Sequence, residues 1–261
     1  MLLFYFGAKK PEQFLELKNV FISSCRNALS SPSGQLEHHL SIAGALIKLS
    51  YYLHGLEYSF FSSFTKIAFL KSFFESMSLY FHKEDVYKVR ESFLLSAIEE
   101  HLQQMKNSPT DLELHVSLAH NFVSLSKIYM EAQEVSFPRS FKKIAKEAKS
   151  KFEITSKRAI EEFIILKEFA PNDPWIHAQL ALCYNHLKMY EEEAREYELM
   201  LELSPNDKEV MFRLGKIYFE LGKNSLGLQI YETLKKEAFE KAEDLLEFYS
   251  SSNFFNQIEL N

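Results

Sequence analysis

Three short phrases built around a proline recur along this chain of 261 residues. They are NSPTD at 107–111, FAPND at 169–173 and LSPND at 203–207. Nine, ten and thirteen residues after each proline stand a leucine, a small residue and an aromatic residue. These nine positions are Leu118, Ala119, Phe122, Leu180, Ala181, Tyr184, Leu214, Gly215 and Tyr218. Agreement at every position indicates that one structural element occurs three times.

The spacing inside each copy is helical. A leucine and an aromatic residue four places later share one helix face, and the small residue beside the leucine lets a neighbouring helix approach closely. Proline cannot continue a helix, whereas the polar residues after it can cap the next one. Asp173 before Pro174 predicts an N-cap and a first turn, and Thr110 with Glu113 has the spacing of a capping box. Each phrase therefore predicts the end of one helix and the start of another.

The step from Pro171 to Pro205 is 34 residues, which is the period of a helix-turn-helix repeat. In this period and in the positions above, the chain resembles the tetratricopeptide repeat family. The resemblance covers roughly 112–249 and is most specific across 171–234. It implies an all-α fold in which helix pairs stack into a right-handed superhelix.

The predicted repeats differ in regularity within an array at 107–250. The units 174–207 and 208–241 match well, although Lys188 stands where a turn glycine is usual. The unit 112–173 is irregular, because 62 residues separate Pro109 from Pro171. We expect an insert near 134–158 that lengthens its second helix, and a capping helix at about 237–250 that covers the last repeat.

The N-terminal region, residues 1–106, is predicted to be helical and rich in aromatic residues. The whole chain has 24 Phe but only 7 Gly and 7 Pro, a balance that favours long packed helices. Helices are expected near 11–29, 35–54, 56–81 and 84–106. The third is apolar nearly all round and is expected to be buried. Divergent repeats and a separate helical bundle both fit this region.

Composition argues against several classes of function. A net charge of -6 disfavours nucleic acid as a partner. Cys25 and Cys183 have no paired spacing, so neither a disulfide framework nor a zinc site is expected, and a reduced, cytoplasmic setting fits. Lys66, Lys71 and Glu75 interrupt the most hydrophobic tract, which argues against an integral membrane protein.

No motif for catalysis, cofactor binding or metal binding is present. The nine histidines lack ligand spacing, and no phosphate-binding glycine loop or nucleophile elbow occurs. We therefore predict no catalytic residue, no cofactor and no metal.

The resemblance implies a concave groove lined by the first helix of each repeat. The lining residues would be Val116, His120, Val123, Trp175, Ala178, Leu182, Asn185, Phe212, Lys216 and Phe219. Most are apolar or aromatic, so the groove suits an amphipathic helix or a hydrophobic peptide, with Trp175 and Phe212 as anchors. The carboxylate-gripping residues of some family members are missing apart from Lys216. The chain's own N-terminal helices are an alternative occupant of the groove.

A basic patch lies in the insert. It consists of Arg139, Lys142, Lys143, Lys146, Lys149 and Lys151. Phe141, Ile144, Ala148 and Phe152 would form an apolar stripe on the same helix. Such a helix could meet an acidic protein or a lipid surface, and a solvated helix face is the alternative.

These observations predict a non-enzymatic protein–protein interaction module with a scaffold or adaptor role. In outline the chain is also similar to the repeat chaperones of bacterial type III secretion, which we keep as an alternative. A second alternative is an enzyme with a site in the N-terminal helices near His38, His39 or His54. Self-association through the N-terminal region is a further possibility.

Overall fold

A computed structural model of the protein describes residues 2–29, 36–60, 68–134 and 141–258, and all regular structure in these ranges is helical. The chain divides into two compact units, which we call the N-terminal unit (1–159) and the C-terminal unit (160–261). This boundary does not coincide with the expected division after Lys106, because the next helix, α5, packs along α4. None of the described helices combines the length and apolarity needed to cross a bilayer.

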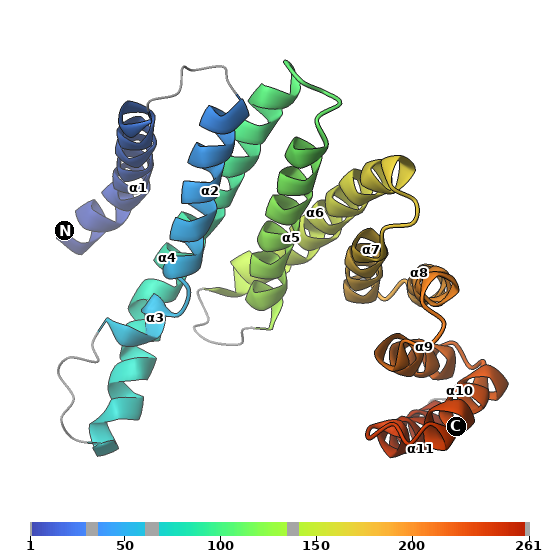
Figure 1. The fold of residues 1–261 in the computed structure, drawn as a ribbon. Coiled ribbons are helices and arrows are strands. Elements are labelled where there is room, and N and C mark those ends of the chain that lie inside the picture. The colour runs from blue at the N-terminus through green and yellow to red at the C-terminus, as the bar shows by residue number, and fades with distance from the viewer. Residues whose placement is uncertain (1, 30–35, 61–67, 135–140, 259–261) are drawn as a thin grey trace. The chain divides into compact units, whose positions relative to one another are not determined.

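The N-terminal unit is built on long helices. They are α1 (Leu2–Ala28), α2 (Leu36–Tyr52), the single turn α3 (Leu56–Ser59), α4 (Ala68–Met105), α5 (Leu112–Gln133) and the first part of α6 (Lys142–Phe169). Figure 1 shows α2 lying beside α4, with α1 on its other side. Ile42 and Leu46 of α2 are fully buried against Phe93 of α4, and Phe21 of α1 closes this core with its ring 6.0 Å from that of Phe93.

The prediction of a buried helix at 56–81, separate from one at 84–106, is wrong. α3 ends at Ser59, and α4 runs without a break through 82–85, because this segment contains neither glycine nor proline. Phe73 and Phe81 are more than half exposed. The reason is visible in Figure 1, where the first turns of α4 extend past the end of α2.

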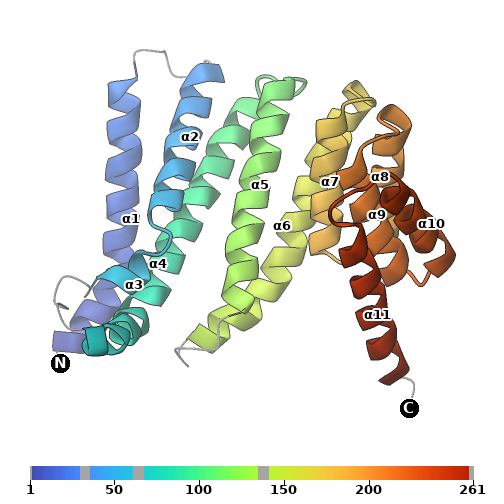
Figure 2. The same ribbon diagram turned by 60° about the horizontal axis from the view of Figure 1, so that its bottom comes forward.

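The C-terminal unit is a stack of short helix pairs. After the last turns of α6 come α7 (Pro174–His186), α8 (Tyr190–Leu203), α9 (Lys208–Glu220), α10 (Asn224–Lys236) and α11 (Ala242–Ile258). α7 packs on α8, α8 on α9, and α9 on α10, while α11 lies against both α9 and α10 (Figure 2). Leu245 of α11 is fully buried against Phe219 of α9, so α11 covers the apolar side of the last pair.

The aspartate of each proline phrase is the N-cap of the following helix. Asp111 accepts a hydrogen bond from the backbone N–H of Leu114, Asp173 from that of Trp175, and Asp207 from those of Glu209 and Val210. A carboxylate here satisfies amides that have no partner within the helix. The cap predicted at Asp173 is confirmed, whereas the capping box assigned to Thr110 and Glu113 is wrong, since Asp111 is the capping residue.

A histidine six residues after the proline fixes two of these turns. Nε2 of His115 lies 3.0 Å from the carbonyl oxygen of Pro109, and Nε2 of His177 lies 2.8 Å from that of Pro171. Nδ1 of His177 also lies 2.6 Å from Glu196 of α8, which accepts from Lys167 of α6 at 2.8 Å. This buried network ties α6, α7 and α8 together within the C-terminal unit.

Candidate partner-binding site

The turns and contacts of α7–α8 and α9–α10 follow one geometry. Leu180 and Ala181 are fully buried at the positions where α9 has Leu214 and Gly215. Lys188 and Gly222, 34 residues apart, both adopt the left-handed conformation, with φ of 56° and 69°. Two consecutive helix pairs thus repeat the same turn in the same register. The fold of this stack is that of a tetratricopeptide-like helical repeat.

No protein-family model and no curated protein matches the sequence, whereas several solved structures resemble the fold. A thermophilic tetratricopeptide protein of Thermus thermophilus, TTC0263, is 15% identical, with a TM-score of 0.38 over 81% of this chain and 99% of that chain. MamA from MSR-1 is 13% identical, with a TM-score of 0.38 over 76% and 97%. The TPR2AB domain of yeast Sti1, in complex with pHSP90, is 11% identical, with a TM-score of 0.32 over 82% and 99%.

A cavity of about 360 Å³ opens in the C-terminal unit where α7, α8 and α9 meet. It contains four of the predicted groove residues, namely Leu182 and Asn185 from α7 and Phe212 and Lys216 from α9. Residues predicted on two successive repeats thus line one cavity. The remaining lining residues are Glu193, Tyr197, Glu209, Arg213, Ile217 and Lys241.

The cavity is not purely apolar, as the groove was expected to be. Glu193 comes from the first turn of α8 and is buried, and burial raises the pKa of its carboxyl to about 7. The amide of Asn185 donates to both carboxyl oxygens at 3.1 and 3.0 Å, and Arg213 lies near enough to favour the charged form, so both oppose this shift. The cavity therefore contains a carboxyl group, that of Glu193, with a pKa of about 7, and the Asn185 amide and the basic side chains of the cavity lie around it.

The two aromatic residues predicted on α9 belong mainly to the core. Phe219 is 1% exposed and packs on Tyr249 of α11 with ring centroids 4.7 Å apart, and Phe212 is buried beside Phe239. α11 covers this side of α9, which is why Phe219 does not line the cavity. Phe212 still contributes to the lining, and the Lys216 ammonium lies 4.5 Å from its ring centroid.

The other predicted groove residues lie outside this cavity. Trp175 is 39% exposed at the start of α7 and packs edge-on against Phe163 of α6, and Ala178 is half-buried one turn later. Val116 and Val123 are half-buried on α5. His120 of α5 is exposed, and these three residues belong to the N-terminal unit.

The basic patch lies on the solvent side of α6. Lys142, Lys143, Lys146 and Lys149 are exposed, while Phe141, Ala148 and Phe152 are buried on the opposite side. The N-terminal unit therefore uses the expected apolar stripe for its own core. Lys151 is separate from the exposed face, because its ammonium lies 2.7 Å from Glu91 of α4. Arg139 lies outside the described residues.

The remaining candidate groups act in packing. Glu100 of α4 is buried and joins Arg26 of α1 at 2.6 Å and His39 of α2 at 2.8 Å, which ties three helices of the N-terminal unit together. Burial raises the pKa of the Cys183 thiol to about 12, so this cysteine is a poor nucleophile. Within the described ranges, no three His, Cys, Asp or Glu residues are grouped closely enough to hold a metal ion.

Several charged residues of the cavity were not predicted from the sequence. Glu193, Arg213 and Lys241 come from three segments that only the fold brings together. One signal was available, because Glu193 and Tyr197 stand four residues apart and therefore share a face of α8. That face also includes the buried Ala194. This placement beside buried apolar residues indicates that Glu193 could itself be buried.

Proposed function

We propose that this protein is a non-enzymatic protein–protein interaction module that acts as a scaffold or adaptor. The observation that carries the proposal is the cavity between α7, α8 and α9, because it gathers side chains from two successive repeats and is open to a ligand. Pockets of about 300 Å³ or more are large enough for a specific contact. The cavity fits one or two side chains of a bound peptide rather than a whole helix.

The chemistry of the lining suggests the kind of peptide. Leu182 and Phe212 offer apolar contact, and Arg213 and Lys216 supply positive charge. A hydrophobic peptide that carries an acidic side chain would satisfy both. An amphipathic helix could present the same two groups one turn apart.

Selection of peptides from a random library by the full chain tests this proposal. The affinity of a selected peptide is then measured for the double variant Leu182→Ala, Lys216→Ala. Both side chains are at least partly exposed, so the fold should be retained. We expect affinity to fall by about tenfold or more, which corresponds to about 1.4 kcal/mol.

The matched control is Leu226→Ala with Lys236→Ala, two exposed residues of α10 outside the cavity. This control should bind the peptide like the parent protein. Equal affinity of all three proteins for every selected peptide would show that the cavity is not the binding site.

We also propose that the exposed lysines of α6 contact an acidic protein segment. Phe141, Ala148 and Phe152 of the apolar stripe are buried and Ile144 is half-buried, so the stripe is not available for insertion into a lipid surface. A labelled oligoglutamate peptide should bind the triple variant Lys142→Glu, Lys146→Glu, Lys149→Glu more weakly than it binds the parent protein.

The control for this test is a second triple charge reversal. It replaces Lys48, Lys106 and Lys127 with Glu, since these lysines are also exposed but lie outside α6. Equal binding of the oligoglutamate peptide by the two triple variants would contradict a role for the α6 lysines.

A further inference from the structure

The N-terminal unit contains a second cavity, of about 600 Å³, far from the groove residues in sequence. Its walls come from α1, α2, α3 and α4, and from Phe60, which follows α3. Leu17 of α1, Leu53 just after α2 and Val89 of α4 are among its lining residues. Most of the lining is apolar, so the walls favour hydrocarbon over water.

Polar groups also line this cavity. Gln13 of α1 and His82 and Asp85 of α4 belong to its lining, and the ring of His82 packs on that of Phe60 with centroids 4.2 Å apart. Asp85 supplies a carboxylate, and Gln13 supplies an amide oxygen that can accept hydrogen bonds. An apolar cavity with a few polar groups is the usual form of a small-molecule site.

The size of the cavity is compatible with a small-molecule ligand. A compact molecule or a single alkyl chain fits within the range of about 300–1,000 Å³ that is typical of ligand pockets.

We propose that this cavity binds a small amphiphile, an aliphatic chain with a cationic head group placed near Asp85. The chain would pack against Leu17, Leu53 and Val89, and the head would donate hydrogen bonds to the carboxylate. The proposal is independent of the protein-binding role, because the cavity lies in the N-terminal unit and the peptide cavity in the C-terminal unit.

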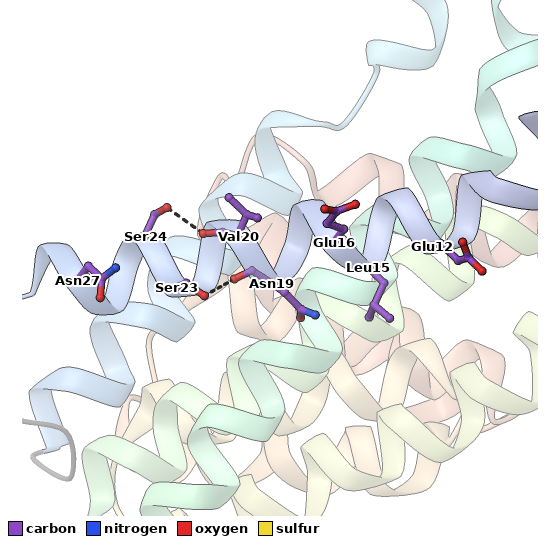
Figure 3. A pocket seen from close by; sticks show the side chains of 8 residues that line it. All are labelled: Glu12, Leu15, Glu16, Asn19, Val20, Ser23, Ser24 and Asn27. Atoms are coloured by element: carbon purple, nitrogen blue, oxygen red, sulfur yellow. Dashed lines mark hydrogen bonds between the residues drawn. The ribbon is translucent and has the colours of Figure 1, made fainter.

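Two leucines of α1 provide a matched pair for the test. Leu17 lines the cavity and is 64% exposed, whereas Leu15 is 53% exposed and lies on another face of α1. Figure 3 shows Leu15 on that face beside Glu12, Glu16 and Asn19. All side chains drawn there come from one helix, so they form a surface rather than an enclosing site.

The experiment measures displacement of the fluorescent probe N-phenyl-1-naphthylamine by dodecylamine from the full chain. Leu17→Asn should weaken dodecylamine binding by about fivefold, because it removes apolar contact, while Leu15→Asn should bind like the parent. Both leucines are exposed, so neither change should unfold the protein. Asp85→Asn should reduce the preference for dodecylamine over dodecanol.

Several outcomes would overturn the proposal. The first is the absence of saturable dodecylamine binding to the parent protein. The second is equal weakening of binding by Leu17→Asn and Leu15→Asn. The third is a dimer, detected by sedimentation, that no longer binds the probe, because a second copy of the chain would then cover the cavity. Val89→Phe gives a further check, since a larger ring fills the cavity. It should abolish binding while circular dichroism shows unchanged helicity.

Discussion

The two units of this protein pack helices in different ways. In the N-terminal unit, α4 alone spans 38 residues and contacts α1, α2, α3 and α5. In the C-terminal unit, α7 to α10 have 13 or 14 residues each and pack mainly on their neighbours in the chain. Short helices with frequent turns need explicit start and stop signals, whereas a long helix needs few. The sequence signals that reveal a repeat are therefore found at its turns.

The largest expected difference between the two units is in how their stability responds to low pH. His101 of α4 is 1% exposed, and burial lowers its pKa from the ordinary 6.5 to about 4. The unfolded chain takes up the proton first as pH falls, so the N-terminal unit loses stability from about pH 6.5 down to pH 4. The full loss is about 3 kcal/mol at pH 4. Denaturation by urea across this range should show a weaker pH dependence for His101→Leu.

Leu102→Ala is the control for this measurement, because Leu102 lies beside His101 on α4, is 43% exposed and does not titrate. Its pH dependence should match that of the parent protein. An unchanged slope for His101→Leu would mean that His101 is not the group responsible.

A second comparison uses the same substitution in both units. A Cβ at Gly227 of α10 would lie 2.5 Å from the ring of Phe219, whereas a Cβ at Gly44 of α2 meets nothing within 4 Å. Gly227→Ala should destabilise the protein by about 2 kcal/mol through overpacking. Gly44→Ala should stabilise it by about 0.5–1 kcal/mol through helix propensity. Thermal unfolding measures both, and shifts of the same sign would contradict the difference in packing.

The third prediction concerns Glu193 in the C-terminal unit, where the pH response has the opposite direction. Its pKa is raised to about 7, so the unfolded chain ionises first as pH rises from 4.5 and the fold loses stability up to about pH 7. Because the carboxyl lines an open cavity, we expect an effect of about 1 kcal/mol. Glu193→Gln should unfold at a higher temperature than the parent above about pH 7 and show no such gain at about pH 4. A gain of the same size at both pH values would rule out ionisation as its cause.

The smallest expected effect lies in the turns between paired helices. Lys188 has φ of 56°, a conformation that costs a side-chain-bearing residue about 1–2 kcal/mol. Glycine removes this cost but adds flexibility to the unfolded chain, so Lys188→Gly should stabilise by about 0.5 kcal/mol. Gly222→Ala, which places a side chain at the equivalent turn position with φ of 69°, should destabilise the protein. Urea titration resolves both, and a destabilising Lys188→Gly would indicate that the lysine side chain has a role of its own.

Local signals made the C-terminal unit predictable. Asp173 and the proline phrases located helix ends, and the 34-residue step set the register of Leu180 with Leu214. The N-terminal unit offered no such markers, so a junction between two helices was predicted at 82–83, where α4 is continuous. Phe219 was misplaced for another reason, because its burial depends on α11, whose position helical periodicity does not specify.

The length of α4 has a mechanical consequence. At 1.5 Å per residue its 38 residues span about 57 Å, and one continuous helix resists bending along that whole length. The stacked pairs of the C-terminal unit meet at turns, where small rotations can add up from one pair to the next. The N-terminal unit should therefore resist stretching and twisting by a partner more strongly than the C-terminal unit does.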